Sequence, residues 1–166
     1  MKIDVSDLFK KKSARKDLNF TVNLDGFNYG EEYIKIISPL KFNGTLSTLG
    51  DLLELQGCVN GTVELTCSRC LVKFPMELDI QVYEKLSNDM ETVDKDEESV
   101  FIDGDTLDIT EIMLNNIILY LPIKRLCKDD CEGLCQKCGT NLNISSCNCT
   151  SDEIDPRLAK LKDFFD

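Results

Sequence analysis

The chain contains neither histidine nor tryptophan among its 166 residues. Without histidine there is no Ser–His or Cys–His dyad and no imidazole to act as a general base. A glycine-rich loop that would cradle phosphate groups is also missing from the sequence. These absences argue against conventional catalysis, so we expect a protein that is not an enzyme and has no small-molecule substrate. They also mean that a metal site would have to rely on sulfur ligands.

Long hydrophobic runs are missing as well. The longest apolar patch, residues 117–123, is far too short to span a bilayer. Residues 1–17 contain no continuous apolar run of the length found in signal peptides. We therefore expect a cytoplasmic protein without a membrane partner, whose thiols stay reduced. Hydrophobic residues make up 42% of the chain, which is enough to bury a core without the help of disulfides.

Basic charge is scarce, since the formal net charge is −11. A nucleic-acid-binding domain usually carries a basic footprint, and this chain has the opposite sign. Residues 86–111 hold ten acidic side chains and one basic one, whereas residues 1–24 hold six basic and three acidic ones. The acidic run at 88–99 is interpreted as a solvated loop or as a docking surface for a basic protein. The basic run at 10–16 is interpreted as a solvated segment or as a contact to RNA phosphates.

Alternation of apolar and polar residues predicts several short strands in the first two-thirds of the chain. They are expected at 18–24, 33–42, 52–59, 62–67 and 74–86. Asn60-Gly61 is a hairpin signal, so the strands on either side of it are expected to pair as antiparallel neighbours. Pro39 predicts an edge, a bend or a break in its strand. The predicted fold class is α+β: mainly an antiparallel β-sheet or partial barrel, with one or two helices and a C-terminal cysteine-rich zinc knuckle.

Helical spacing of apolar residues begins at Ile109. Asp108 and Glu111 predict a capping box at the start of this helix, and Pro122 predicts its end. A second helix is expected after Asp155, because its apolar residues form one stripe that would dock on the protein's own core. That stripe consists of Leu158, Leu161, Phe164 and Phe165.

These elements suggest one compact unit with two parts. Residues 1–122 are expected to form an antiparallel β core with an acidic loop and a helix. Residues 123–166 are expected to form a cysteine-rich, zinc-binding segment and a C-terminal helix, packed with the core as one unit.

Nine cysteines stand at positions 58, 67, 70, 127, 131, 135, 138, 147 and 149. Clusters of reduced thiols in a cytosolic chain are more often metal ligands or catalytic groups than disulfides, and an odd count fits a disulfide framework poorly. Eight of the nine form four clips of two thiolates each: Cys67/Cys70, Cys127/Cys131, Cys135/Cys138 and Cys147/Cys149. A structural zinc takes four ligands, so eight thiolates would make two sites and leave Cys58 over.

The spacing of the clips favours one pairing among several. Only eight residues separate Cys138 from Cys147, which favours a compact site made of the two C-terminal clips. The first two clips would then form the other site, because the entropy of closing a long loop grows only slowly with its length. Gly139 suits a backbone kink that points amides at the thiolates. A single zinc, at the C-terminal clips or with a swapped clip, is the alternative, so we expect one or two zinc ions per chain.

A redox function is the competing interpretation of the same cysteines. A Cys-x-x-Cys pair can be a thioredoxin-like site, but such a site opens a helix in a βαβ unit, and Cys67–Cys70 follows a predicted strand instead. A zinc–thiolate site that releases its metal on oxidation is the other redox interpretation. Cys58 is interpreted as a small apolar residue buried on a strand.

Five motifs follow one another in order: CSRCL at 67–71, LP at the helix end at 121–122, CEGLCQKCGTNLN at 131–143, CNC at 147–149 and DPRLAKLKDF at 155–164. Together they resemble the YceD family, also called the large ribosomal RNA subunit accumulation proteins. The resemblance runs from about Cys58 to the C-terminus, and before that only the strand character is similar. It implies a bacterial, cytoplasmic, non-enzymatic protein needed for normal accumulation of 23S ribosomal RNA. The positions to which it assigns a role are Cys67, Cys70, Cys127, Cys131, Cys135, Cys138, Cys147 and Cys149.

The combined hypothesis is an assembly factor for the large ribosomal subunit. Its acidic surface would suit a basic ribosomal protein or an rRNA–protein intermediate better than naked RNA, so contact with rRNA would be direct or indirect. Zinc would hold the C-terminal third in shape. The alternative is a redox- or metal-responsive zinc–thiolate regulatory protein.

Overall fold

The structure is a computed structural model that describes residues 1–10, 15–50, 52–89, 99–102 and 104–149. Long strands with alternating burial dominate the fold. In chain order the elements are β1 (Lys2–Asp4), α1 (Ser6–Lys10), β2 (Arg15–Val22), β3 (Gly26–Tyr29), β4 (Glu32–Leu49), β5 (Leu52–Thr66), β6 (Lys73–Ser87), β7 (Ser99–Phe101), β8 (Thr106–Asp108) and α3 (Ile109–Tyr120). Most of the acidic run, part of the basic run and the helix expected after Asp155 lie outside the described residues.

Six strands form one sheet in the order β2-β4-β5-β6-β7, with β3 also pairing with β4. Every pair is antiparallel except β6 with β7, which is parallel. Strands β1 and β8 form a separate antiparallel pair. The prediction of a mainly antiparallel sheet with one or two helices is therefore confirmed for the described part of the chain. No pairing joins β2 or β3 to β7 within that part, so the sheet stays open and does not close into a barrel.

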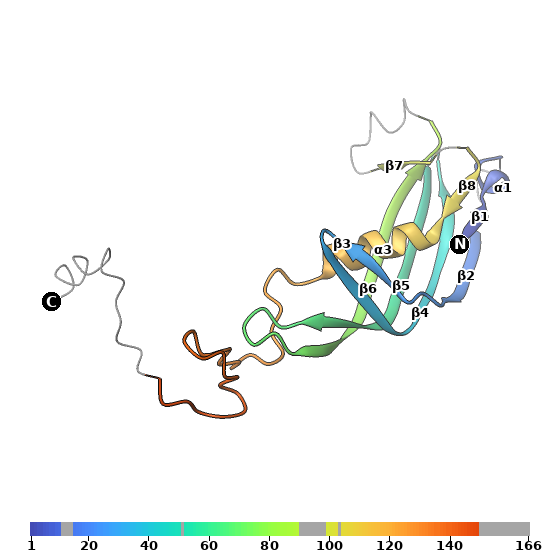
Figure 1. The fold of residues 1–166 in the computed structure, drawn as a ribbon. Coiled ribbons are helices and arrows are strands. Elements are labelled where there is room, and N and C mark those ends of the chain that lie inside the picture. The colour runs from blue at the N-terminus through green and yellow to red at the C-terminus, as the bar shows by residue number, and fades with distance from the viewer. Residues whose placement is uncertain (11–14, 51, 90–98, 103, 150–166) are drawn as a thin grey trace, which may run out of the picture.

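The two ends of the sheet carry different structures, as Figure 1 shows. Helix α3 runs across one face of the sheet, and α1, β1 and β8 lie together at one end. The cysteine-rich segment that follows α3, coloured orange to red, extends from the opposite end beside the turn that joins β5 to β6. The helix therefore carries the chain from one end of the sheet to the other.

Alternate side chains of the long strands build the core against α3. On β5 every buried residue lies on one face: Leu53, Leu55, Val59, Val63 and Leu65, all at 0% exposure. Ile109, Met113 and Ile117 of the helix are equally buried, which fits their spacing of four residues on one helical face. Burying a side chain of this size contributes about 1.5–3 kcal/mol, so this contact is a main source of stability.

The hairpin predicted at Asn60-Gly61 is wrong. Strand β5 runs unbroken through both residues and pairs along its length with β4 and β6. The chain reverses instead near Gly50, whose φ of 66° suits glycine, and at the turn formed by residues 67–72. The local turn signal of Asn-Gly is therefore overridden by pairing with two neighbouring strands.

The glycines inside β5 make room for side chains of β4. A Cβ on Gly57 would lie 2.5 Å from Cζ of Phe42, and one on Gly61 would lie 2.7 Å from Cδ2 of Leu40. The Phe42 ring also stacks on Phe20 of β2, with 5.2 Å between ring centroids. These glycines are thus explained by close packing rather than by a turn.

Pro39 lies inside β4, at an irregularity of the sheet. The pairing of β4 with β5 shifts its register between Ser38 and Lys41. Along the same strand, the pairing with β3 includes Lys35 and the pairing with β2 includes Leu40. The proline therefore falls between two ladders, where a missing N–H is tolerated, and marks a bend rather than a strand end.

Helix α3 begins after Asp108 and ends before Pro122, as predicted. The Asp108 side chain accepts a hydrogen bond of 3.0 Å from the N–H of Thr110, which caps the first turn. At the other end the N–H of Leu121 donates to the Ile117 carbonyl at 3.1 Å, and Pro122 follows. Neither helix of the described ranges is long and apolar enough to cross a bilayer.

Candidate metal centres

The turn between β5 and β6 carries the first cysteine clip. The N–H of Leu71 donates to the Cys67 carbonyl at 3.0 Å, and the N–H of Cys67 donates to the Val72 carbonyl at 2.9 Å. These bonds close a tight knuckle that holds Cys70 beside Cys67. The setting is strand, turn and strand, whereas a thioredoxin-like dithiol opens a helix.

The segment after α3 folds back onto this turn and brings the second clip to it. The N–H of Ser68 donates to the Arg125 carbonyl at 2.8 Å. The Arg125 side chain is only 11% exposed, forms an ion pair with Glu32 of β4, and lies 5.4 Å from the centre of the Tyr29 ring. Arg125 thus fastens the segment to the turn and to the β3–β4 hairpin, which positions the cysteines that follow it.

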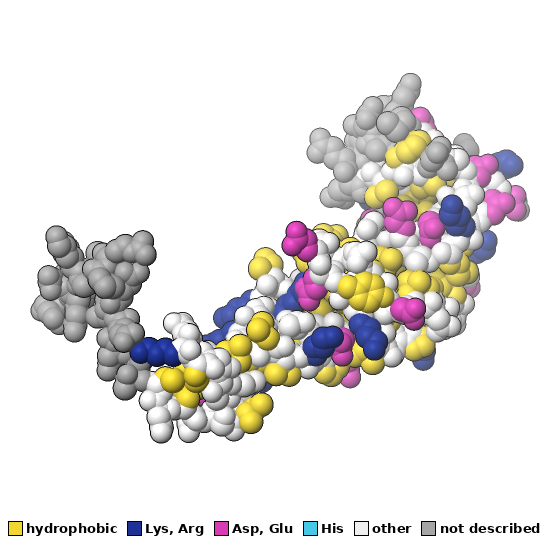
Figure 2. Space-filling model, viewed as in Figure 1, with side chains coloured by type: hydrophobic (Ala, Val, Ile, Leu, Met, Phe, Trp, Pro, Cys, Tyr) yellow, Lys and Arg dark blue, Asp and Glu magenta, His cyan; other side chains and the backbone are white. Residues whose placement is uncertain are grey.

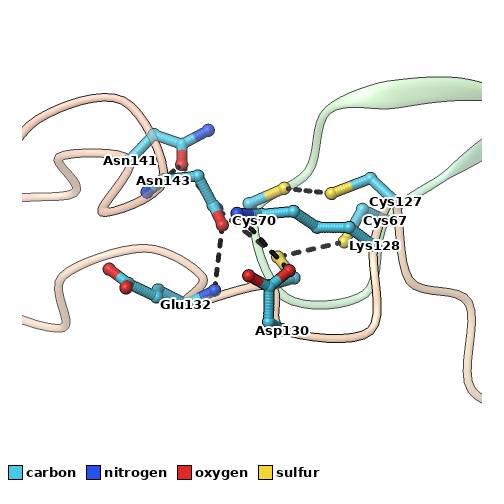
Figure 3. A network of polar contacts seen from close by, with 9 residues as sticks. Cys67, Cys70, Cys127, Lys128, Asp130, Glu132, Asn141 and Asn143 are labelled. Atoms are coloured by element: carbon cyan, nitrogen blue, oxygen red, sulfur yellow. Dashed lines mark hydrogen bonds and ion pairs between the residues drawn. The ribbon is translucent and has the colours of Figure 1, made fainter.

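The first two clips together form the inner cluster, defined as Cys67, Cys70, Cys127 and Cys131. The Sγ atoms of Cys67 and Cys131 lie 3.7 Å apart, and those of Cys70 and Cys127 lie 3.6 Å apart (Figure 3). All four sulfurs lie within 4.8 Å of one another, and all four cysteines are free. A tetrahedral thiolate site with bonds of about 2.3 Å has edges of about 3.8 Å. The inner cluster therefore has the spacing needed to hold a metal ion.

The last two clips form the outer cluster, defined as Cys135, Cys138, Cys147 and Cys149. Its sulfurs also lie within 4.8 Å of one another, so it too could hold a metal ion. Its cysteines alternate between half-buried and exposed, whereas three of the four in the inner cluster are buried. The inner cluster is further packed against Phe74, Leu126 and Leu134. The two clusters thus have the same ligands but unequal access to solvent.

Both Cys-x-x-Cys turns use one backbone conformation. The residue after the second cysteine donates its N–H to the carbonyl of the first, at 3.0 Å for Leu71 and 2.9 Å for Gly139. Both residues have positive φ, 60° for Leu71 and 73° for Gly139. The kink predicted at Gly139 is therefore present, and Leu71 adopts the same left-handed conformation without the freedom of glycine.

Substitution at these two positions should change metal affinity in opposite directions. Leu71→Gly is expected to strengthen binding at the inner cluster about 5-fold, since left-handed backbone costs a non-glycine residue roughly 1 kcal/mol. The Leu71 side chain is 63% exposed, so little packing is lost. Gly139→Ala is expected to weaken the outer cluster by a similar factor. Competition with a chromogenic chelator measures both affinities, and changes of the same sign in the two variants would contradict this reasoning.

Ionisation within the inner cluster is uneven. Burial opposes ionisation of the Cys67 thiol, but the backbone N–H groups of Cys70 and Arg69 outweigh it and lower its pKa to about 6. Burial raises the pKa of Cys127 to about 12, with a further contribution from the neighbouring thiols. One thiolate therefore forms readily while the next would be placed beside an existing anion. A bound cation would remove that obstacle.

The outer cluster follows the same pattern. Hydrogen bonds from the Thr140 side chain and backbone lower the pKa of Cys138 to about 6. The pKa of Cys149 is raised to about 12, first by its hydrogen bond with Cys138 and then by burial. In both clusters, then, four thiolates can coexist only when a cation compensates their charge.

The structure gathers the eight clip cysteines into the two sets that their spacing favours. Cys58 lies apart from both sets. It is half-buried on β5 rather than fully buried, and its thiol donates to Oδ1 of Asp79 at 3.1 Å. Burial raises the pKa of this thiol, which keeps it protonated. Arg125 and Asn143 are not among the residues that the sequence predicts. No local pattern in the sequence indicates their contacts, because each depends on a partner that is distant in sequence.

Comparison with known proteins places these cysteines in a shared region. The family model described as "Large ribosomal RNA subunit accumulation protein YceD" matches residues 55–165, a range that includes both clusters. An uncharacterized protein of Bacillus subtilis, YlbN, is 26% identical over 167 residues, covering 98% of this chain and 95% of its own length. An uncharacterized protein of Mycobacterium tuberculosis is 29% identical over 170 residues, covering 97% and 79%.

A plant relative has a descriptive name. The "Large ribosomal RNA subunit accumulation protein YCED homolog 1, chloroplastic" of Arabidopsis thaliana is 25% identical over 179 residues. The match covers 90% of this chain and 54% of the plant protein, so the plant protein is considerably longer. No solved structure matches the chain.

Proposed function

This chain belongs to the YceD family, and we propose that it is a non-enzymatic factor that supports accumulation of 23S ribosomal RNA during assembly of the large ribosomal subunit. The observation that carries the proposal is the family match over residues 55–165. The name of the plant relative points to the same process. We propose that the protein acts in the cytoplasm, as expected for a factor that binds ribosomal subunits before their assembly is complete.

Both clusters are proposed to hold zinc, giving two ions per chain. Structural zinc is bound by four ligands, and sulfur is the donor that a chain without histidine offers in each cluster. Four thiolates complete the coordination and leave no position for a reacting water, which supports a structural rather than a catalytic role. When bound, zinc supplies folding free energy, with apparent values of about 10–16 kcal/mol in small zinc modules.

The partner is proposed to be a basic ribosomal protein or an rRNA–protein intermediate. The net charge of −11 favours a basic partner over naked RNA. Figure 2 supports this choice for one face: on its coloured part, dark blue basic side chains are interspersed with magenta acidic ones and form no continuous basic area. A bare RNA site would need lysines and arginines matched to phosphates.

A pull-down from ribosome-depleted lysate, with the zinc-loaded full chain as bait, tests the proposal. We expect a large-subunit ribosomal protein to be recovered at moderate salt and to remain after ribonuclease treatment. Its recovery should fall as salt rises, because charge attraction between exposed groups is screened. An unrelated bait with a similar negative charge controls for non-specific capture of basic proteins. If neither ribosomal protein nor 23S rRNA is enriched over that control, the proposal fails.

A redox- or metal-responsive regulator is the second candidate, favoured by the exposure of Cys138 and Cys149 in the outer cluster. Thiolates that solvent can reach are more readily oxidised than buried ones. Repeating the pull-down after mild peroxide separates the candidates. Release of zinc together with a changed set of captured proteins supports the regulator, and an unchanged set counts against it.

A further inference from the structure

Asn143 connects the two clusters. It lies on the loop between the two clips of the outer cluster, yet its Nδ2 donates to Sγ of Cys131 in the inner cluster at 3.4 Å. Its Oδ1 accepts from the N–H of Glu132 at 3.0 Å (Figure 3). One amide thus binds both the sulfur of an inner ligand and the backbone directly after it. An N–H donor to a metal-bound thiolate orients that ligand and stabilises its charge.

The Asn143 amide is itself held in place. Oδ1 of Asn141 accepts from the backbone N–H of Asn143 at 3.0 Å and from its Nδ2 at 2.8 Å. The N–H of Leu142 donates to the Gly133 carbonyl at 2.9 Å. Gly133 has a φ of 82°, and a Cβ there would lie 3.1 Å from the Arg69 carbonyl oxygen, so this segment runs directly along the inner turn.

Asn143 lies between the two clips of the outer cluster, so closing that cluster constrains the chain on both sides of it. The loop of residues 139–146 joins Cys138 to Cys147, and no helix or long strand supports it. Its backbone is anchored by a bond of 2.8 Å from the N–H of Cys135 to the Thr140 carbonyl. The far end of the loop, at Cys147, meets Cys135 and Cys138 through the four sulfurs, so closure at that end relies on the sulfurs being drawn together. Without a cation those sulfurs would repel one another once ionised.

We propose that the two clusters are coupled: a metal ion in the outer cluster raises the metal affinity of the inner cluster, and Asn143 carries the coupling as a positioning residue. By reciprocity, a metal ion in the inner cluster raises the affinity of the outer one by the same factor. Since the outer cluster is the more exposed, its occupancy controls how firmly the buried ion is held. The proposal rests on metal binding by both clusters and not on the ribosomal role.

Asn143→Leu, which keeps the size of the side chain but removes its polar atoms, tests the coupling in the full zinc-loaded chain. We expect the inner cluster to bind zinc about 10-fold more weakly, within the range usual for loss of an outer-shell partner of a metal ligand. Chelator competition gives the affinities, and alkylation mapped by mass spectrometry assigns each ion to a cluster through its protected cysteines. Ser145→Ala is the matched control, because Ser145 is exposed on the same loop.

Testing Asn143→Leu in a variant that lacks the outer site distinguishes coupling between the clusters from a simple packing effect. In Cys138→Ser/Cys149→Ser, which removes the outer site, inner affinity should fall by a similar factor, and Asn143→Leu should then add nothing. With cobalt in place of zinc, Asn143→Leu should move the sulfur-to-metal charge-transfer band of the inner site to lower energy, because the sulfur loses a hydrogen-bond donor. A change below about twofold in inner affinity, an undiminished effect in the double-serine background, or uptake of a single ion would overturn the proposal.

Discussion

Cys131→Ser is expected to remove the inner zinc and to release the segment that follows α3 from the β5–β6 turn. Cys131 is 1% exposed, and its sulfur lies 3.7 Å from that of Cys67. A serine hydroxyl does not ionise at neutral pH and so cannot replace the thiolate. We expect the free energy of unfolding of the zinc-loaded chain to fall by at least about 4 kcal/mol, since loss of a structural metal is among the few single changes with so large an effect.

Cys58→Ser is the matched control for that prediction. Cys58 is the one cysteine outside both clusters, and its thiol contacts Asp79 rather than another sulfur. Native mass spectrometry should count one zinc in Cys131→Ser and two in Cys58→Ser. Urea unfolding should separate the two variants by the expected free energy. A Cys131→Ser chain that keeps two ions and the wild-type midpoint would show that Cys131 is not a ligand of a structural metal ion.

The grouping of the cysteines could be predicted because the two C-terminal clips are close in sequence, which leaves the other two clips to form the second set. The Cys-x-x-Cys turns are local structures, and Cys67–Cys70 and Cys135–Cys138 share the same backbone hydrogen bond. The same is true of α3, where periodicity and the Asp108 cap are local properties. The family could also be recognised, because the motifs that carry the resemblance lie within the matched region.

What could not be predicted depends on partners far away in sequence. β1 pairs with β8, where Ile3 lies opposite Leu107, and neither segment is long enough to signal a strand. Arg125 finds Glu32 only after α3 has crossed the sheet. Asn143, on the loop of the outer cluster, contacts Cys131 of the inner one, twelve residues away in sequence. Short-range propensity contains no information about such contacts, and it was misleading for Asn60-Gly61, where pairing on both sides of β5 decided the conformation.

The two clusters differ in how far they depend on the rest of the fold. The outer cluster is made within residues 135–149, so its loop closes over a short stretch of chain. The inner cluster joins the β5–β6 turn to the segment after α3, and both must be in place before four sulfurs meet. Metal bound at the inner cluster would therefore report on the integrity of the sheet and of the helix that packs on it.

Met113→Lys is expected to abolish metal binding at the inner cluster without touching a ligand. Met113 is 0% exposed in the middle of α3. A lysine buried there would have to lose its proton, and shifts of about 3–5 pKa units correspond to roughly 4–7 kcal/mol. That is comparable to the whole stability of a typical domain, so the sheet and α3 should unfold. With zinc in excess, the outer cluster should remain loaded, because its four ligands are close together in sequence.

Leu119→Lys separates this effect from that of the added charge. Leu119 is 82% exposed on the last turn of the same helix, where a positive charge is favourable, so this variant should bind two ions. In Met113→Lys, alkylation should modify the four inner cysteines and spare the four outer ones. Protection of all eight would mean that the residues after α3 and the β5–β6 turn assemble without the core. Loss of both ions would mean that the outer cluster needs the inner one to fold, because a tenfold coupling is too small to empty a site in excess zinc.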